Sequence, residues 1–171
     1  MIIRNAKISD LPAIVEIYNQ AILTKTATAD LTPIEADSKL LWFKEHDPDK
    51  YPIFVSEIDN QVIGWISLSP YRFGREALRF TAEVSYYIHS EHKRKGNATY
   101  LMDFILKECP KYQIKTLFAI ILEHNFASIN LVKKFNFEKW GFLPCVADFD
   151  GKEYGHLYYG LRVQLRDQIP I

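Results

Sequence analysis

One stretch of the chain, residues 81–107, constrains the fold more than any other. It reads TAEVSYYIHSEHKRKGNATYLMDFILK. Residues 81–88 are rich in β-branched and aromatic side chains, with Glu83 set among apolar ones, which is typical of a strand. Apolar residues between 100 and 105 follow at helical spacing. The stretch therefore predicts a strand, a tight loop and a helix, in that order.

The loop in this stretch is basic and contains a single glycine. Its sequence is Lys93-Arg94-Lys95-Gly96-Asn97-Ala98. A small residue where a helix begins lets backbone N–H groups and the positive end of the helix dipole approach an anion. A pyrophosphate fits such a loop best, and one glycine is too few for a nucleotide P-loop or a dinucleotide fingerprint. The alternative is a charged turn that leads into an amphipathic helix.

Composition sets limits on the class of protein. The 171 residues are 48% hydrophobic and 25% charged, which predicts one domain over residues 1–171 with residues 164–171 as a short tail. Lys plus Arg and Asp plus Glu both number 21, so no basic field favours nucleic acid. The sequence shows no apolar leader, no apolar run long enough to span a bilayer and no CxxC spacing. These features predict a cytoplasmic protein that does not bind membranes.

The rest of the chain predicts strands and helices in the order β-α-α-β-β-β-α-β-α-β-β. A short strand over residues 2–5 precedes a helix capped by Ser9, and a second helix ends near His46. Residues 24–32 form a loop suited to lining a pocket. A hairpin joins strands at 53–55 and 62–66 through Asp59-Asn60. A strand at 116–122 precedes a helix that starts after Asn125. Strands at 137–142 and 157–163 are joined around Asp150-Gly151.

The basic loop resembles motif A of the GNAT superfamily of N-acetyltransferases, written [Q/R]-x-x-G-x-[G/A]. Lys93 replaces the usual Gln or Arg, while Gly96 and Ala98 match. Over nearly its whole length the chain is similar to the phosphinothricin and methionine sulfoximine N-acetyltransferases. The matching pieces are Ile17-Tyr18-Asn19, Thr32-Pro33, Trp42-Phe43, Tyr51-Pro52, Val62-Ile63-Gly64-Trp65, residues 69–79, Glu83-Val84-Ser85 with Tyr87, the loop, and Asn125 with Ala127-Ser128-Ile129.

The resemblance implies a fold, a cosubstrate and an assembly. The fold class is α/β (α+β), with a mixed central sheet of about seven strands flanked by about four helices. Acetyl-CoA is the implied cosubstrate. The residues implied to bind it are Tyr86, Tyr87, Ile88, Lys93, Arg94, Lys95, Gly96, Asn97, Ala98, Thr99, Asn125 and Ser128. Relatives of this kind are commonly homodimers, for which the strands around Tyr154, Tyr158 and Tyr159 suggest an interface.

Departures from the family pattern bear on the substrate more than on the cosubstrate. Arg94 stands where glycine is frequent, Val132 where the family often has histidine, and Asn136 where glycine usually precedes Phe137. The segment with Arg72, Phe73 and Arg75 matches the part of these enzymes that recognises a substrate carboxylate.

Glu83 is the candidate general base. Transfer of an acetyl group to an amine needs a neutral nucleophile and a group that takes up the ammonium proton. A carboxylate on a strand in the core of the sheet is partly desolvated, which raises its pKa toward the useful range. Contact with the amine can be direct or through water. The alternative is a structural carboxylate paired with Arg72, Arg75 or Arg79.

Other reactive side chains do not suggest a different chemistry. His89, His92 and His124 lack the spacing of a zinc site, and Cys109 and Cys145 have no identified histidine partner. We therefore expect no metal and an N-acetyltransferase that acts on the primary amine of a small, amino-acid-like molecule. Two alternatives remain open: an enzyme that acetylates a protein, a peptide or another amine, and a non-catalytic module that binds CoA.

Overall fold

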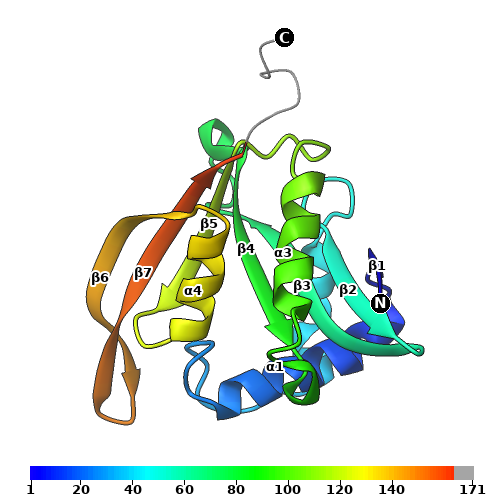
Figure 1. Cartoon of the computed structure of the whole chain (residues 1–171), viewed down its shortest axis with the longest axis horizontal. Coiled ribbons are helices and arrows are strands. Elements are labelled where there is room, and N and C mark those ends of the chain that lie inside the picture. The colour runs from blue at the N-terminus through cyan, green and yellow to red at the C-terminus, as the bar shows by residue number, and fades with distance from the viewer. Residues whose placement is uncertain (164–171) are drawn as a thin grey trace.

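The computed structural model describes residues 1–163 and contains a seven-stranded sheet (Figure 1). The strand order is β1-β2-β3-β4-β5-β7-β6, and only the β4–β5 pairing is parallel. The strands are β1 (Ile2–Asn5), β2 (Ile53–Ile58), β3 (Gln61–Pro70), β4 (Thr81–Ile88), β5 (Thr116–Leu122), β6 (Glu138–Phe149) and β7 (Lys152–Arg162). The α-helices are α1 (Leu11–Leu23), α2 (Leu40–Glu45), α3 (Asn97–Glu108) and α4 (Phe126–Lys134). The predicted fold class is confirmed. The predicted tail, 164–171, lies outside the described residues.

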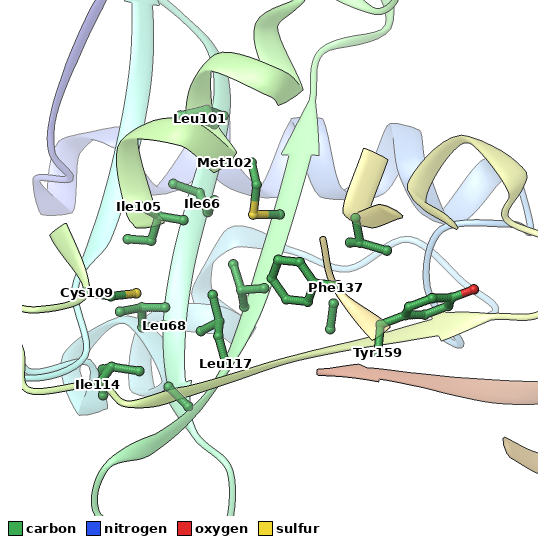
Figure 2. Packing of buried hydrophobic residues seen from close by; sticks show 14 of the residues in the cluster. Ile66, Leu68, Leu101, Met102, Ile105, Cys109, Ile114, Leu117, Phe137 and Tyr159 are labelled. Atoms are coloured by element: carbon green, nitrogen blue, oxygen red, sulfur yellow. The ribbon is translucent and has the colours of Figure 1, made fainter. Parts of the chain in front are cut away.

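Helices cover both faces of the sheet. In Figure 1, α3 and α4 lie in front of the strands and α1 runs behind them. Alternate residues of β4 point to opposite faces. Ala82 and Val84 pack with α3 in the larger core, which Figure 2 shows around Leu101, Met102 and Ile105, whereas Tyr87 packs against the α1 side. Glu83 shares its face with Tyr87, so its side chain lies on the α1 side of the sheet.

The contact between β4 and β5 is short. The two strands pair over only three residues, from Thr81 opposite Thr116 to Glu83 opposite Phe118. On its other edge β4 pairs with β3 over seven residues, from Gly64 opposite Ile88 to Pro70 opposite Ala82. Beyond Glu83 the two strands therefore separate, and the edge of β4 that faces β5 has no strand beside it.

The C-terminal hairpin is longer than expected. The predicted strand at 137–142 continues to Phe149, and the turn at Asp150-Gly151 has the expected place, with positive φ at both residues. Two register shifts and the positive φ of Cys145 interrupt the period-two pattern of β6, which hid the second half of this strand from sequence reasoning. The suggestion of Tyr159 as an interface residue is wrong, because its side chain is 4% exposed and lies in the larger core (Figure 2).

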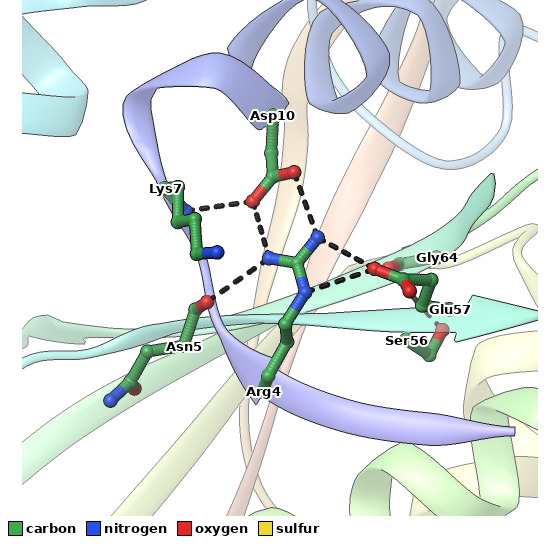
Figure 3. A network of polar contacts seen from close by, with 7 residues as sticks. All are labelled: Arg4, Asn5, Lys7, Asp10, Ser56, Glu57 and Gly64. Atoms are coloured by element: carbon green, nitrogen blue, oxygen red, sulfur yellow. Dashed lines mark hydrogen bonds and ion pairs between the residues drawn. The ribbon is translucent and has the colours of Figure 1, made fainter. Parts of the chain in front are cut away.

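The N-terminal strand is held by an ion network centred on Arg4 (Figure 3). Its guanidinium donates to both carboxylate oxygens of Asp10 at 2.7 and 3.0 Å and to Glu57 on β2 at 2.9 and 2.7 Å. Asp10 also accepts the backbone N–H of Lys7 at 2.7 Å. The prediction of Ser9 as the helix cap is wrong, because α1 begins at Leu11 and the N-cap position falls on Asp10, whose carboxylate bonds Arg4 and the Lys7 N–H and makes no capping bond to the helix.

The second predicted helix is shorter than expected. A 3-10 turn at Ala36–Lys39 leads into α2, which ends at Glu45 with His46 as its C-cap. The Asp59-Asn60 turn is confirmed, with positive φ at both residues, as two-residue hairpin loops require. Within residues 1–163, no helix is both long and apolar enough to cross a membrane.

Candidate active site

The basic loop leads directly into the N-terminus of α3. Gly96 is the N-cap of this helix, with φ of +85°, a conformation that glycine adopts without strain. The side chain of Asn97 is buried and donates to the carbonyl of His92 at 2.8 Å, which fixes the loop against the preceding turn. The first N–H groups of a helix have no partner within it, so this helix end offers donors to an anion.

A cleft of about 340 Å³ lies in front of this helix end. Every residue predicted to bind the cosubstrate lines it except Lys95. The opposite wall comes from the end of α1 and the loop after it, through Ala21, Thr24, Thr26 and Ala27, which agrees with the expectation that residues 24–32 line a pocket. Sequence reasoning missed His92, Ala127 and Leu131, which also line the cleft.

A narrow slot of about 40 Å³ continues from the cleft between the separated strands. Residues 84–87 of β4 and 119–121 of β5 line it, together with Asn125 and Ser128. It begins one residue beyond the last paired residue of β4, Glu83. An extended chain in this slot would lie along the free edge of β4, where backbone groups are available for hydrogen bonds.

The wall formed by α4 is well ordered. Asn125 caps the helix by accepting the N–H of Ser128 at 3.1 Å, as its position predicted. Tyr86 lines both the cleft and the slot, and burial raises the pKa of its hydroxyl to about 12. The Ser128 side chain is near enough to offset part of this rise in pKa, but the geometry gives the buried hydroxyl no hydrogen bond to Ser128 or to any other group among residues 1–163. A buried hydroxyl without a partner is costly, so a ligand in the slot would relieve that cost.

Glu83 directly precedes the β4 residues that line the slot. It is half-buried, and burial raises the pKa of its carboxyl. Across residues 1–163, no ion pair or side-chain hydrogen bond reaches this carboxylate. Buried carboxylates are uncommon unless they are paired or functional.

Two of the three arginines named as possible partners of Glu83 lie over aromatic rings instead. The guanidinium of Arg72 lies 5.6 Å from the centre of the Tyr71 ring. The guanidinium of Arg79 lies 4.3 Å from the centre of the Phe80 ring. No ion pair joins Arg72, Arg75 or Arg79 to Glu83 among residues 1–163, so the structural pair considered as the alternative is not formed. Arg72, Phe73 and Arg75 are exposed, with 91% of Phe73 accessible.

An aromatic cluster beside Glu83 was not foreseen. Phe118 is the β5 partner of Glu83, and its ring stacks on that of Tyr71 with ring centres 4.7 Å apart. It also meets the rings of Trp140 and Tyr158 edge-on, with ring centres 5.4 and 6.3 Å away. Trp140 lies over Gly160, where a Cβ atom would collide with its ring. These residues come from four separate segments, so only the folded sheet brings them together.

No group of three or more His, Cys, Asp or Glu that could hold a metal ion occurs within residues 1–163. The predicted metal-free site stays a prediction. Of the three histidines considered, His92 lines the cleft, and His124 bonds the carbonyl of Lys25 at 2.9 Å.

Comparison with known proteins identifies the family. Residues 14–137 match the model of the acetyltransferase (GNAT) family. The chain belongs to this family. That membership confirms the predicted enzyme class, an acetyltransferase that depends on acetyl-CoA.

Individual relatives in this family are similar over most of their length. The chain is 39% identical over 155 residues to a Bacillus subtilis protein named "Putative phosphinothricin acetyltransferase YwnH", which covers 90% of this chain and 94% of that protein. It is 32% identical over 154 residues to the L-methionine sulfoximine/L-methionine sulfone acetyltransferase of Pseudomonas aeruginosa, with 90% and 87% covered. The GNAT superfamily phosphinothricin acetyltransferase of Sinorhizobium meliloti, solved in complex with acetyl-CoA, superimposes with a TM-score of 0.89 at 26% identity, covering 99% and 92%.

Two departures from the family pattern have a conformational explanation. Arg94 and Asn136 both adopt positive φ, of 60° and 61°. Glycine adopts this region without strain, whereas other residues enter it at a cost that is smallest for Asn and Asp. The chain therefore keeps a glycine-type backbone at both places with a different side chain.

Proposed function

We propose that this GNAT enzyme transfers the acetyl group of acetyl-CoA to the primary amine of a small, amino-acid-like substrate of the phosphinothricin or methionine sulfoximine/sulfone type, with Glu83 as the general base. The observation that supports the proposal is the position of Glu83, a half-buried carboxylate with no ion-pair partner among residues 1–163, at the last paired residue of β4 before the slot between β4 and β5. The anion-binding end of α3 lies at the other end of the same continuous cleft.

The cosubstrate has a natural path through this cleft. The pyrophosphate would contact the N–H groups that follow Gly96, with Lys93 and Arg94 nearby. The pantetheine arm would enter the slot and bond to the backbone of Tyr86–Ile88, with Asn125 and Ser128 on the opposite wall. Lys95 would act through its charge alone, because it does not line the cleft.

The reaction needs only one proton acceptor on the protein. An ammonium group gives a proton to the Glu83 carboxylate, directly or through water, and the neutral amine then attacks the acetyl carbonyl carbon. The new C–N bond forms, the C–S bond breaks and CoA leaves as the thiolate. A backbone N–H of β4 would stabilise the negative charge that develops on the carbonyl oxygen.

The amine would approach from the α1 side of the sheet, because the Glu83 side chain points there. The aromatic cluster around Phe118 offers an apolar wall beside the carboxylate. Arg72 and Arg75 on the exposed 69–79 segment would reach the carboxylate of an amino-acid substrate. This arrangement fits a small amino acid whose carboxylate faces the arginines and whose amine faces Glu83.

The test is a free-thiol release assay with acetyl-CoA. The acceptors should include L-methionine sulfone, L-methionine sulfoximine, phosphinothricin, common amino acids, polyamines and peptides. We expect the highest kcat/KM for the sulfone, sulfoximine or phosphinothricin. Faster turnover of a peptide would contradict the proposed substrate class, and a protein that binds acetyl-CoA but releases no thiol with any acceptor would contradict the enzymatic role of Glu83.

The proposed carboxylate recognition can be tested in the same assay. Arg72→Ala and Arg75→Ala should mainly raise KM for an amino-acid substrate, since the lost ion pair contributes equally in the ground and transition states. Methionine sulfone amide, which lacks the carboxylate, should be insensitive to both changes. Equal losses for acid and amide would argue against this role.

The homodimer expected from relatives is part of the proposal. Strand β6 forms the edge of the sheet and exposes Trp140, Phe142, Leu143 and Val146 at 42–52% of their surface. An exposed apolar edge strand favours association with a second surface. A monomeric mass by light scattering at micromolar concentration would contradict this assembly.

A further inference from the structure

A hydrogen-bonded pair, His46 and Ser69, lies beside Glu83 and has no role in the mechanism above. His46 is the C-cap of α2 and Ser69 lies near the end of β3. The Nε2 atom of His46 is 3.2 Å from the Ser69 hydroxyl, and its Nδ1 atom is 2.7 Å from the carbonyl oxygen of Trp42. The ring also packs against Trp42, with ring centres 4.5 Å apart.

The partners of the His46 ring determine where its hydrogens lie. A carbonyl oxygen can only accept, so Nδ1 carries the hydrogen that it shares with Trp42. Burial lowers the pKa of His46, so the ring is neutral near pH 7 and Nε2 keeps its lone pair. The Ser69 hydroxyl must therefore donate to Nε2. Its single hydrogen is committed, and its oxygen is left as an acceptor.

The β3–β4 register places this acceptor next to the candidate base. Ser69 is directly opposite Glu83. Partners across an antiparallel pair share a face of the sheet, with Cβ atoms about 4.5–5.5 Å apart. The contact of Trp65 with its partner Tyr87, at 4.7 Å between ring centres, shows that this row lies on the α1 side. Two oxygen acceptors thus stand side by side with no donor between them among residues 1–163.

We propose that His46 orients the Ser69 hydroxyl so that Ser69 Oγ accepts a hydrogen from the substrate amine while Glu83 takes its proton. This inference rests on the proposed function and specifies how that site recognises an amine. A primary ammonium group offers three hydrogens. One passes to Glu83 as a proton. A second stays on the nitrogen and is donated in a hydrogen bond to Ser69 Oγ, which fixes the direction in which the freed lone pair points. Ser69 contacts the substrate, and His46 is a positioning residue that acts through Ser69.

The kinetic test uses Ser69→Ala with Ser67→Ala as the matched control. Ser67 lies two residues away on the same strand and face, and it is buried without a hydrogen-bond partner among the described residues. With L-methionine sulfone as the acceptor, Ser69→Ala should lower kcat/KM about tenfold, the size of a lost hydrogen bond to a charged group. Ser69→Thr, which keeps the hydroxyl, should retain most of the activity. Ser67→Ala should retain the parental kcat/KM, and all variants should bind acetyl-CoA as the parent does.

A double-mutant cycle tests whether His46 acts through Ser69. His46→Phe keeps a ring against Trp42 but removes the acceptor, and it should lower kcat/KM about fivefold. The double variant with Ser69→Ala should be no worse than Ser69→Ala alone, because the effects of coupled residues are not additive. Additive losses, or a Ser69→Ala variant with parental kcat/KM, would overturn the inference while leaving the proposed function intact.

The tautomer of His46 gives a readout that does not depend on activity. Long-range proton–nitrogen NMR correlations should show a neutral ring with hydrogen on Nδ1, and Ser69→Ala should shift the Nε2 resonance but not Nδ1. A ring protonated on Nε2 alone would overturn the inference. A parent protein that releases no thiol with any amine would contradict the proposed function itself and would remove this inference with it.

Discussion

The Glu83 carboxylate is partly desolvated and has no ion-pair partner in the described part of the chain, which has opposite consequences for activity and stability. Glu83→Gln keeps the size of the side chain but removes its basicity. Its kcat should fall by about 10²–10⁴-fold, the usual range for a lost general base, while acetyl-CoA still binds. The parental rate should rise with pH as the carboxyl group loses its proton.

The stability of the same variant separates a base from a structural ion-pair partner. Burial raises the pKa of Glu83, so the folded state holds this proton more tightly than the unfolded state does. The contribution of Glu83 to stability therefore falls as pH rises from its ordinary pKa through its raised one. At pH 7, Glu83→Gln should melt at or above the parental temperature. A lower melting temperature together with parental turnover would indicate a structural carboxylate instead.

At the scale of elements, the loop before α3 depends on the conformation of Gly96. A Cβ atom at Gly96 would meet nothing within 4 Å, so any effect of a side chain comes from the positive φ and from blocked access to the helix end. Gly96→Val should raise the Kd for acetyl-CoA about tenfold, or about 1.4 kcal/mol, and added salt should weaken binding to the parent. Gly151, which has φ of +91° and equally open surroundings in the β6–β7 turn, supplies the control. If Gly151→Val lowers affinity as much as Gly96→Val does, the loop assignment is wrong.

The junction of β1, α1 and β2 should respond to acid. Arg4 holds the pKa of the Asp10 carboxyl below its ordinary value of 3.8. This contribution to stability is therefore complete above pH 3.8 and is lost as pH falls through the lowered pKa. Asp10→Asn should reduce the free energy of unfolding at pH 7 by about 1–3 kcal/mol, and the difference from the parent should shrink in acid. Asp103 forms an exposed ion pair with Lys107 and supplies the control: Asp103→Asn should change the free energy of unfolding little.

Sequence patterns predicted the elements best where local signals agree. The alternation in residues 81–88, the glycine before α3 and the cap at Asn125 each have a local physical cause, and all three appear in the structure. Local signals failed where tertiary contacts decide. Ser9 lies inside the short 3-10 turn Ile8–Asp10, and the Asp10 carboxylate at the N-cap position bonds Arg4 instead of the helix. The second half of β6 departs from the period-two pattern at the register shifts around Cys145.

At the scale of the whole molecule, sequence patterns could not predict the slot or the surroundings of Glu83. The slot depends on where two strands stop pairing, and neither strand encodes this by itself. Phe118 and Ser69 flank Glu83 in the sheet, and Trp140 and His46 contact these two neighbours from distant segments, so the surroundings of Glu83 are a property of the assembled sheet. The basic loop predicted a pyrophosphate site from its residues, whereas acetyl-CoA as the cosubstrate came from the resemblance to a known family.

The three-residue contact between β4 and β5 also divides the sheet into two halves, which we call leaves: β1–β4 form one leaf and β5–β7 the other. The short contact between them acts as a hinge. Above the hinge, the pantetheine arm would serve as a removable strand that connects both leaves. Saturating acetyl-CoA should therefore slow amide hydrogen exchange in residues 84–88 and 119–122 alike, and at 100 times Kd it should add about 2.7 kcal/mol to stability. Protection confined to the 93–98 loop would mean that the ligand rests on one leaf only. If both leaves are protected, the apoenzyme is a sheet that its own cosubstrate completes.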